Sequence, residues 1–127
     1  MKIIGFSKVH DKVLSLSKFL FKTNDRASCF LRKEEHQLLI QYLIKSDMIF
    51  SKTLAIFDGI NYIAPYMIFS DGEWIWPSYY SYNLIKEDFI NSDFLSHVKQ
   101  KSFIITPLTG EQKKELTIFL EKEMLSF

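Results

Sequence analysis

The clearest periodic pattern of apolar and polar residues runs from Lys33 to Lys45. Acids near its start and Lys45 at its end suit the helix dipole. We therefore predict a helix over residues 33–45 whose apolar residues, three and four positions apart, form one buried stripe. This stripe comprises Leu38, Leu39, Tyr42 and Leu43.

A less regular pattern lies near the N-terminus. Val9, Val13, Leu16 and Leu20 are spaced as in an amphipathic helix over residues 8–21. Residues 13–19 also alternate serine with apolar residues, which is typical of a strand. Helix is the prediction, with strand left open, and the polar residues 23–28 are expected to form a turn.

Two Asp-Gly pairs, at residues 58–59 and 71–72, predict tight hairpins. A type I′ turn needs positive φ at both central residues, which Asp followed by Gly tolerates. The pairs separate three apolar runs and so predict an antiparallel meander over residues 52–57, 60–69 and 73–76. Pro65 cannot donate a ladder hydrogen bond, and we expect a bulge, bend or break beside it.

Both tryptophans and three of the six tyrosines fall within residues 70–82. Trp74 and Trp76 should share one face of their strand, while Ile75 takes the other. Pro77 should end the ladder, because it suits the first turn of a following helix. The inner side of that helix would carry Tyr79, Tyr82, Ile85 and Phe89. We interpret Trp74, Trp76 and Tyr82 as core residues.

The last third of the chain predicts two more helices. Ser92 is placed to cap the first, whose inner face would hold Phe94, Leu95 and Val98. Residues 103–105 are a candidate fourth strand. Thr109 and Gln112 fit a capping box for the second helix. The buried stripe of that helix would comprise Leu116, Phe119, Leu120 and Met124.

These elements predict one α+β domain spanning residues 1–127. Its small antiparallel sheet would have three to four strands in a meander, with helices packed mainly on one face. The single cysteine, Cys29, cannot form an internal disulfide, and no apolar run has the length of a membrane span or a secretory signal. We therefore expect a cytoplasmic protein.

Charge is unevenly distributed along the chain. Residues 1–52 hold ten Lys and Arg against five Asp and Glu, whereas residues 53–95 hold one lysine against six acids. The acidic stretch is also the most aromatic one. If these acids form a surface patch, it would attract a basic protein and repel a phosphate backbone.

No motif for catalysis, a metal or a cofactor is present. The three histidines, His10, His36 and His97, lack metal-ligand spacing, and the glycines are isolated. We therefore expect no enzyme activity, no metal and no cofactor. Basic residues recur through positions 8–26 and could form a nucleic-acid-binding face, but we interpret them as the solvated side of a helix.

The segment from Phe69 to Ile85, FSDGEWIWPSYYSYNLI, resembles small bacterial immunity proteins of contact-dependent growth inhibition and related polymorphic toxin systems. The resemblance implies a protein that binds one cognate toxin C-terminal domain, often a nuclease, and blocks its active site or substrate surface. The alternative is a non-catalytic interaction or regulatory module with an endogenous partner. If the resemblance holds, we expect the toxin-binding residues to be Asp58, Asp71, Glu73, Tyr79, Tyr80, Glu87 and Asp88.

Overall fold

The computed structural model describes residues 1–7, 10–11 and 28–123, and it has the predicted α+β fold. The helices are α1 (Lys33–Lys45), α2 (Tyr80–Ile85), α3 (Ser92–Gln100) and α4 (Gly110–Glu123). The strands are β1 (Lys2–Ile3), β2 (Ser28–Phe30), β3 (Asp47–Asp58), β4 (Asn61–Ser70), β5 (Trp74–Pro77) and β6 (Phe89–Asn91). The helix expected over residues 8–21 falls almost entirely outside the described residues, as does most of the turn after it.

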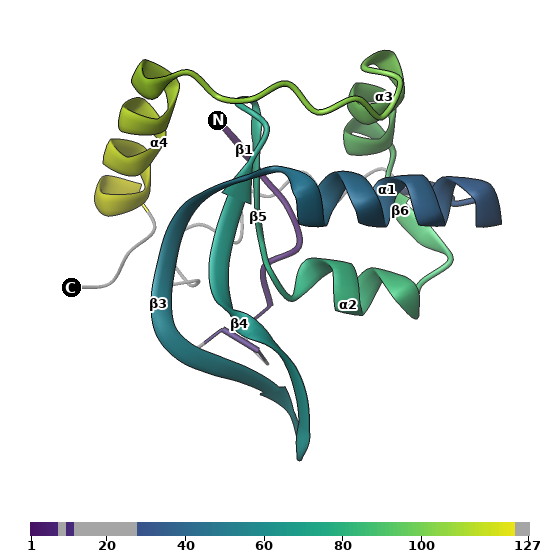
Figure 1. Cartoon of the computed structure of the whole chain (residues 1–127). Coiled ribbons are helices and arrows are strands. Elements are labelled where there is room, and N and C mark those ends of the chain that lie inside the picture. Colours follow the sequence, from purple (N-terminus) through teal and green to yellow (C-terminus); the bar gives the residue numbers. More distant parts are fainter. Residues whose placement is uncertain (8–9, 12–27, 124–127) are drawn as a thin grey trace.

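The main sheet has four strands in the order β1-β5-β4-β3. Strands β3, β4 and β5 form the predicted antiparallel meander, in which β3 and β4 make a long curved hairpin (Figure 1). The fourth strand is β1, which pairs with β5 in parallel. Strands β2 and β6 form a separate antiparallel pair.

The prediction of a fourth strand at residues 103–105 is wrong, because these residues form a connection between α3 and α4. Ser102 and Phe103 have φ angles of 53° and 57°, so the chain leaves α3 through a left-handed turn. From this connection Phe103 and Ile105 pack against the hydrophobic core. Ile104 between them is 64% exposed, so this apolar run is a partly buried loop.

The first Asp-Gly pair forms a hairpin, but its loop is shifted by one residue from the prediction. Asp58 still pairs with Asn61, so Gly59 and Ile60 are the two loop residues. Gly59 supplies the positive φ, 64°. The type I′ geometry expected with Asp58 as a central residue is therefore not formed.

The second pair also connects two strands, through the three residues 71–73. Gly72 has φ 103°, whereas Asp71 has no positive φ, so the expected type I′ turn is wrong here as well. The Asp71 side chain instead accepts hydrogen bonds from the backbone N–H groups of Glu73 and Trp74, at 3.0 and 2.9 Å. The turn is thus held by a side chain.

A bulge lies beside Pro65, as predicted. Pro65 pairs with Ala55 and Tyr66 pairs with Lys52, so two residues of β3 are unmatched between these pairs. The bulge lets β4 continue through the proline, which lacks a donor.

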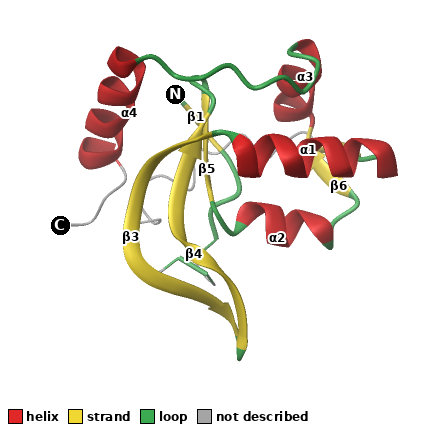
Figure 2. Ribbon diagram, viewed as in Figure 1, coloured by secondary structure: helices red, strands yellow, loops and turns green. Residues whose placement is uncertain are grey.

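Strand β5 separates two halves of the core. As predicted, Trp74 and Trp76 point to one side, where they pack with residues of α1, α2 and α3, while Ile75 joins the cluster that includes α4. The ring of Phe94 on α3 lies 5.0 and 5.8 Å from the rings of Trp74 and Trp76. Three of the four helices therefore cover the tryptophan face, and α4 packs on the other (Figure 2).

Helices α1, α3 and α4 agree closely with the predictions. The bounds of α1 match, although Leu38 is exposed where burial was expected. Asn91, one residue before the predicted cap, accepts the Phe94 N–H and caps α3, whose predicted inner face is buried. Thr109 and Gln112 form the capping box of α4 through reciprocal hydrogen bonds, and Leu116 and Leu120 are buried while Met124 lies outside the described residues.

The helix after Pro77 is shorter and rotated relative to the prediction. It ends at Ile85, and Phe89 belongs to strand β6. Tyr80 and Leu84, one turn apart, are its buried residues, whereas Ile85 is 62% exposed. The interpretation of Tyr82 as core is only partly correct, because its side chain is half-buried.

Glu35 is a buried acid that ties α1 to α3. Its Oε2 lies 2.5 Å from Lys99 Nζ, and its Oε1 accepts hydrogen bonds from the backbone N–H and Nε of Arg32. The hydrogen bond from Lys99, opposed by burial and reinforced by Arg32, lowers the pKa of Glu35 to about 2. Since the folded pKa lies below the ordinary 4.5, the stabilisation is present above pH 4.5 and is lost as the pH falls towards 2.

We expect Glu35→Gln to lower the free energy of unfolding by about 1–2 kcal/mol at pH 7, because its charged partners are partly solvated. The difference from the wild type should shrink as the pH falls to about 2, where Glu35 is losing its charge in the wild type as well. Urea unfolding between pH 7 and pH 2 measures this difference in the free energy of unfolding. Glu34→Gln, at the exposed neighbouring position, is the control. An equal difference at pH 7 and pH 2 would contradict the claim that the charge of Glu35 stabilises the fold.

Candidate functional site

The seven residues predicted to bind a toxin do not form one exposed surface. Asp71, Tyr79 and Tyr80 are buried. The prediction of a surface contact is wrong for Asp71 and Tyr79, because the side chains of both are hydrogen-bonded inside the protein. Asp58 is half-buried, and Glu73, Glu87 and Asp88 are exposed. The positions therefore divide into interior groups and a smaller set of exposed acids.

Asp71 is the centre of the first buried network. Its Oδ2 accepts the Tyr42 hydroxyl at 2.5 Å and lies 2.6 Å from Nε2 of His97, while Oδ1 holds the turn. Burial opposes ionisation, but the hydrogen bonds from Tyr42, from the backbone of Trp74 and Glu73, and from His97 outweigh it and lower the pKa of Asp71. Asp71 is therefore a charged structural residue.

His97 is held between two carboxylates. Its Nε2 faces Asp71, and its Nδ1 lies 3.2 Å from Oε2 of Glu73, whose side chain is 62% exposed. Because both ring nitrogens already face carboxylate oxygens, neither is placed to take a proton from a substrate. The geometry favours a structural role for this histidine, and it ties Glu73 to α3.

A second buried network joins the N-terminal segment to the sheet. The carboxylate of Asp11 accepts the hydroxyl of Tyr66 at 2.8 Å and that of Tyr79 at 3.0 Å. Burial, with the negative charge of Asp11, raises the pKa of both tyrosines. Tyr79 is therefore a structural residue of the interior, because its hydroxyl donates a hydrogen bond to a buried carboxylate.

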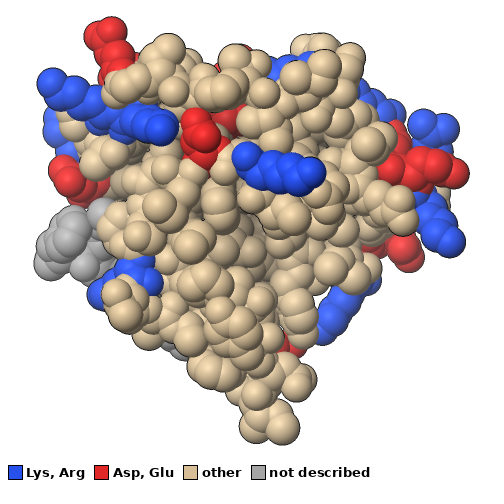
Figure 3. Space-filling model, viewed as in Figure 1, with Lys and Arg blue, Asp and Glu red and all other residues tan. Residues whose placement is uncertain are grey.

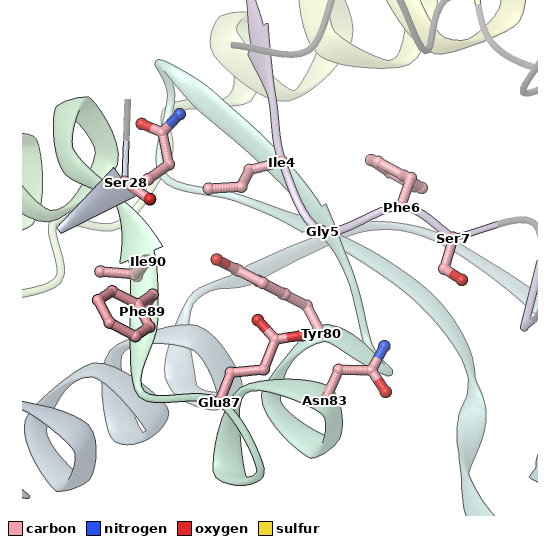
Figure 4. Close-up of a pocket in the computed structure, with 11 residues that line it drawn as sticks. Ile4, Gly5, Phe6, Ser7, Ser28, Tyr80, Asn83, Glu87, Phe89 and Ile90 are labelled. Atoms are coloured by element: carbon pink, nitrogen blue, oxygen red, sulfur yellow. The ribbon is translucent and has the colours of Figure 1, made fainter. Parts of the chain in front are cut away.

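Helix α2 lies between two recesses. Residues 80, 83 and 87, three and four apart, line one of them, and residues 78, 81, 82 and 85 line the other. The first, which we call the polar recess, has a volume of about 410 Å³ (Figure 4). Its described walls are Ile4, Gly5, Phe6, Ser7, Ser28, Tyr80, Asn83, Glu87, Phe89, Ile90 and Asn91.

The recess on the other side of α2 is apolar and measures about 370 Å³. It is bounded by residues of β4, α1 and α2, among them Met67, Ile44 and Ile85 respectively. At Tyr82 it adjoins Asp58, whose Oδ2 accepts the Tyr82 hydroxyl at 3.0 Å and lies 3.6 Å from Lys86 Nζ. The Tyr82 hydrogen bond, opposed by partial burial and aided by Lys86, lowers the pKa of Asp58.

The exposed acids Glu87 and Asp88 adjoin two exposed aromatic rings. Phe30 and Phe89 are 61% and 58% exposed, and their rings pack edge to face with centroids 6.0 Å apart. We call Phe30, Glu87, Asp88 and Phe89 the acidic aromatic surface. Strand pairing creates it, because Phe30 of β2 is the partner of Phe89 of β6.

The cations nearest to this surface in the sequence are already paired. Lys86 contacts Asp58 and Tyr82, and Arg32 contacts Glu35. Among the described residues, Glu87 and Asp88 form no ion pair. Both side chains are exposed to solvent. Glu73 does not join them, because it is bound to His97 on α3.

The face of the molecule seen in Figure 3 has a different character. Lys, Arg, Asp and Glu lie mostly around its margin, and the centre and the hairpin below it are almost free of charge. The hairpin itself exposes large apolar side chains at Leu54, Phe57, Ile60 and Tyr62. Exposed apolar area of this kind is common at protein contact surfaces.

Sequence reasoning missed two residues of the site, Phe30 of the acidic aromatic surface and Gly5 of the polar recess. Phe30 had no local signal, since its meaning depends on pairing with a strand about sixty residues later. Gly5 did have one, because an isolated glycine inside an apolar run marks a close approach of backbone to another group. A Cβ atom at Gly5 would lie 2.3 Å from Cγ of Tyr80, and Gly5 has φ 82°.

We expect Gly5→Ala to lower the free energy of unfolding by about 2–3 kcal/mol, through positive-φ strain and collision with the Tyr80 ring. Gly59→Ala is the matched control, because Gly59 also has positive φ but nothing lies within 4 Å of the added carbon. Its loss should be about 1 kcal/mol. Thermal or urea unfolding measures both, and equal losses would show that the Tyr80 contact contributes nothing.

Within residues 1–7, 10–11 and 28–123, no three His, Cys, Asp or Glu side chains are grouped to hold a metal ion. No helix in the described part of the chain has both the length and the apolar content needed to cross a bilayer. Comparison with protein-family models, curated proteins and solved structures gave no match.

Proposed function

We propose that this chain is an immunity protein that binds the toxin domain of a cognate bacterial toxin and blocks its active site or substrate surface. It would act in the cytoplasm of the protected cell, without catalysis. The resemblance of residues 69–85 to such proteins motivates the proposal. The structural observation that carries it is the acidic aromatic surface, whose two carboxylates form no ion pair within the described residues and lie beside two exposed rings.

Such a surface has two properties that suit a basic protein partner. Its carboxylates raise the association rate with a positively charged surface, such as the substrate groove of a nuclease. Phe30 and Phe89 add rigid apolar area that is exposed in the free chain and would be buried on binding. A phosphate backbone would be repelled by the same charges, which favours protein over nucleic acid as the partner.

The buried titratable groups support a non-catalytic role. Asp71 is hydrogen-bonded to His97 and to two backbone N–H groups, and Asp11 accepts hydrogen bonds from two tyrosines. Groups arranged in this way fix the fold, whereas a general base must present a free acceptor to its substrate. The proposed mechanism is therefore occlusion of the toxin by contact.

The experiment is co-expression with the toxic C-terminal domain encoded directly upstream. We expect cells that make this chain to grow when the toxin domain is induced, and we expect the two proteins to co-purify as a stable complex. A folded chain that neither rescues growth nor co-purifies would contradict the proposal. That outcome would favour an interaction module with an endogenous partner.

A further inference from the structure

The polar recess holds one charged side chain among its described walls, the carboxylate of Glu87. Figure 4 shows Glu87 and Tyr80 side by side at one wall, with Phe89 across the recess on β6. Asn83 and Ser28 add polar groups to the lining. The volume of about 410 Å³ falls within the range of roughly 300–1,000 Å³ that ligand pockets have.

We propose that this recess receives a single cationic side chain, lysine or arginine, of the partner protein. The inference rests on the proposed function for the source of that side chain, and it adds where the partner is anchored. One carboxylate with no ion pair in the described residues calls for one positive charge, and the aromatic walls would contact the aliphatic stem.

The orientation of the groups favours a cation over other ligands. A positive group beside Glu87 would lie near the rings of Tyr80 and Phe89, and aromatic faces attract cations. An anion would meet Glu87 in the recess and Asp88 next to it. A purely apolar side chain would leave the Glu87 carboxylate partly desolvated without a partner, which is unfavourable.

The local backbone holds the recess in shape. The N–H of Lys86 donates to the carbonyl of Asn83, and that of Glu87 donates to the carbonyl of Leu84, so the end of α2 directs residue 87 towards β6. Beside Glu87, the Tyr80 ring rests against the backbone of Gly5. The site is thus formed before any partner binds, which reduces the entropy lost on binding.

The test uses the whole chain, labelled with ¹⁵N, and three small probes followed by amide chemical shifts. The probes are N-acetyl-lysine methylamide, N-acetyl-arginine methylamide and the neutral, similarly shaped N-acetyl-norleucine methylamide. We expect the two cationic probes to shift the amide signals of Gly5, Asn83 and Ile90 in a saturable way, with dissociation constants in the millimolar range. The norleucine probe should not.

Glu87→Gln should weaken binding of the cationic probes about tenfold, through loss of a charge-assisted hydrogen bond. Glu111→Gln on α4 is the matched control, since Glu111 is an exposed acid that does not line the recess, and it should change the affinity less than about twofold. Equal shifts with norleucine, no saturable shift at these amides, or no effect of Glu87→Gln would each overturn the inference. If the chain protects cells from the toxin but gives any of these three results, the inference about the recess fails while the proposed function stands.

Discussion

We expect replacement of Asp71 by alanine to lower the free energy of unfolding by about 3–5 kcal/mol. The substitution removes a buried charge that holds the turn between β4 and β5 and receives hydrogen bonds from α1 and α3. It leaves the hydroxyl of Tyr42 and the Nε2 atom of His97 buried without their partner. Three separate parts of the fold thus lose a common anchor.

Urea unfolding at neutral pH measures this loss. Glu73→Ala is the matched control, because Glu73 belongs to the same turn and contacts the same histidine from the solvent side. Its substitution should change stability by less than about 1 kcal/mol. A loss of that size for Asp71→Ala would show that the network contributes little, and would reopen a surface role for Asp71.

The second large effect is expected on binding. Reversing both charges of the acidic aromatic surface, Glu87→Lys with Asp88→Lys, should weaken binding to the cognate toxin domain about 100-fold or more, while thermal stability stays within a few degrees of the wild type. Like charges placed opposite each other at an interface cost several kcal/mol, and 100-fold corresponds to about 2.7 kcal/mol. Both side chains are exposed and have no ion pair to lose within the described residues.

Isothermal titration of the purified toxin domain measures the affinities. The matched control is Glu111→Lys with Glu115→Lys on α4, which makes the same change of charge at exposed positions on a helix that packs against the other face of the sheet. The control should retain affinity within about tenfold, since only long-range attraction is reduced. Equal weakening by both pairs would indicate that net charge, and no particular surface, governs binding.

Local signals were enough to predict most of the secondary structure. The alternation of Trp74, Ile75 and Trp76 gave both their strand and their faces, and Thr109 with Gln112 gave the start of α4. These features depend on neighbours within a few residues. A capping box and a strand face each follow from a fixed spacing of residues, which can be read from the sequence.

Long-range contacts decided what the sequence could not show. Asp71 stands in a polar, turn-forming stretch that is typical of a surface, but Tyr42 and His97, which are distant in sequence, enclose it. Strand β1 has only two residues, and its parallel pairing with β5 leaves no periodic trace. The pattern of neighbouring residues predicts neither the burial of Asp71 nor the pairing of β1 with β5.

The candidate site was predicted in part. Glu87 and Asp88 were identified as exposed acids from the charge of the central stretch, and both are exposed. Phe89 was assigned to the inner face of a helix, because the spacing of apolar residues after Pro77 did not reveal that α2 ends at Ile85. Only the strand pair formed by β2 and β6 places it beside Phe30 and the acids.

Growth protection by three forms of the chain tests the central claim most directly. Cells induced to make the upstream toxin domain would carry the wild type, the Glu87→Lys and Asp88→Lys form, or the Glu111→Lys and Glu115→Lys form, at equal levels of folded protein. The account predicts growth with the wild type and the α4 form, and arrest with the form altered at the acidic aromatic surface. Full protection by that altered form would contradict the claim that the toxin is bound there.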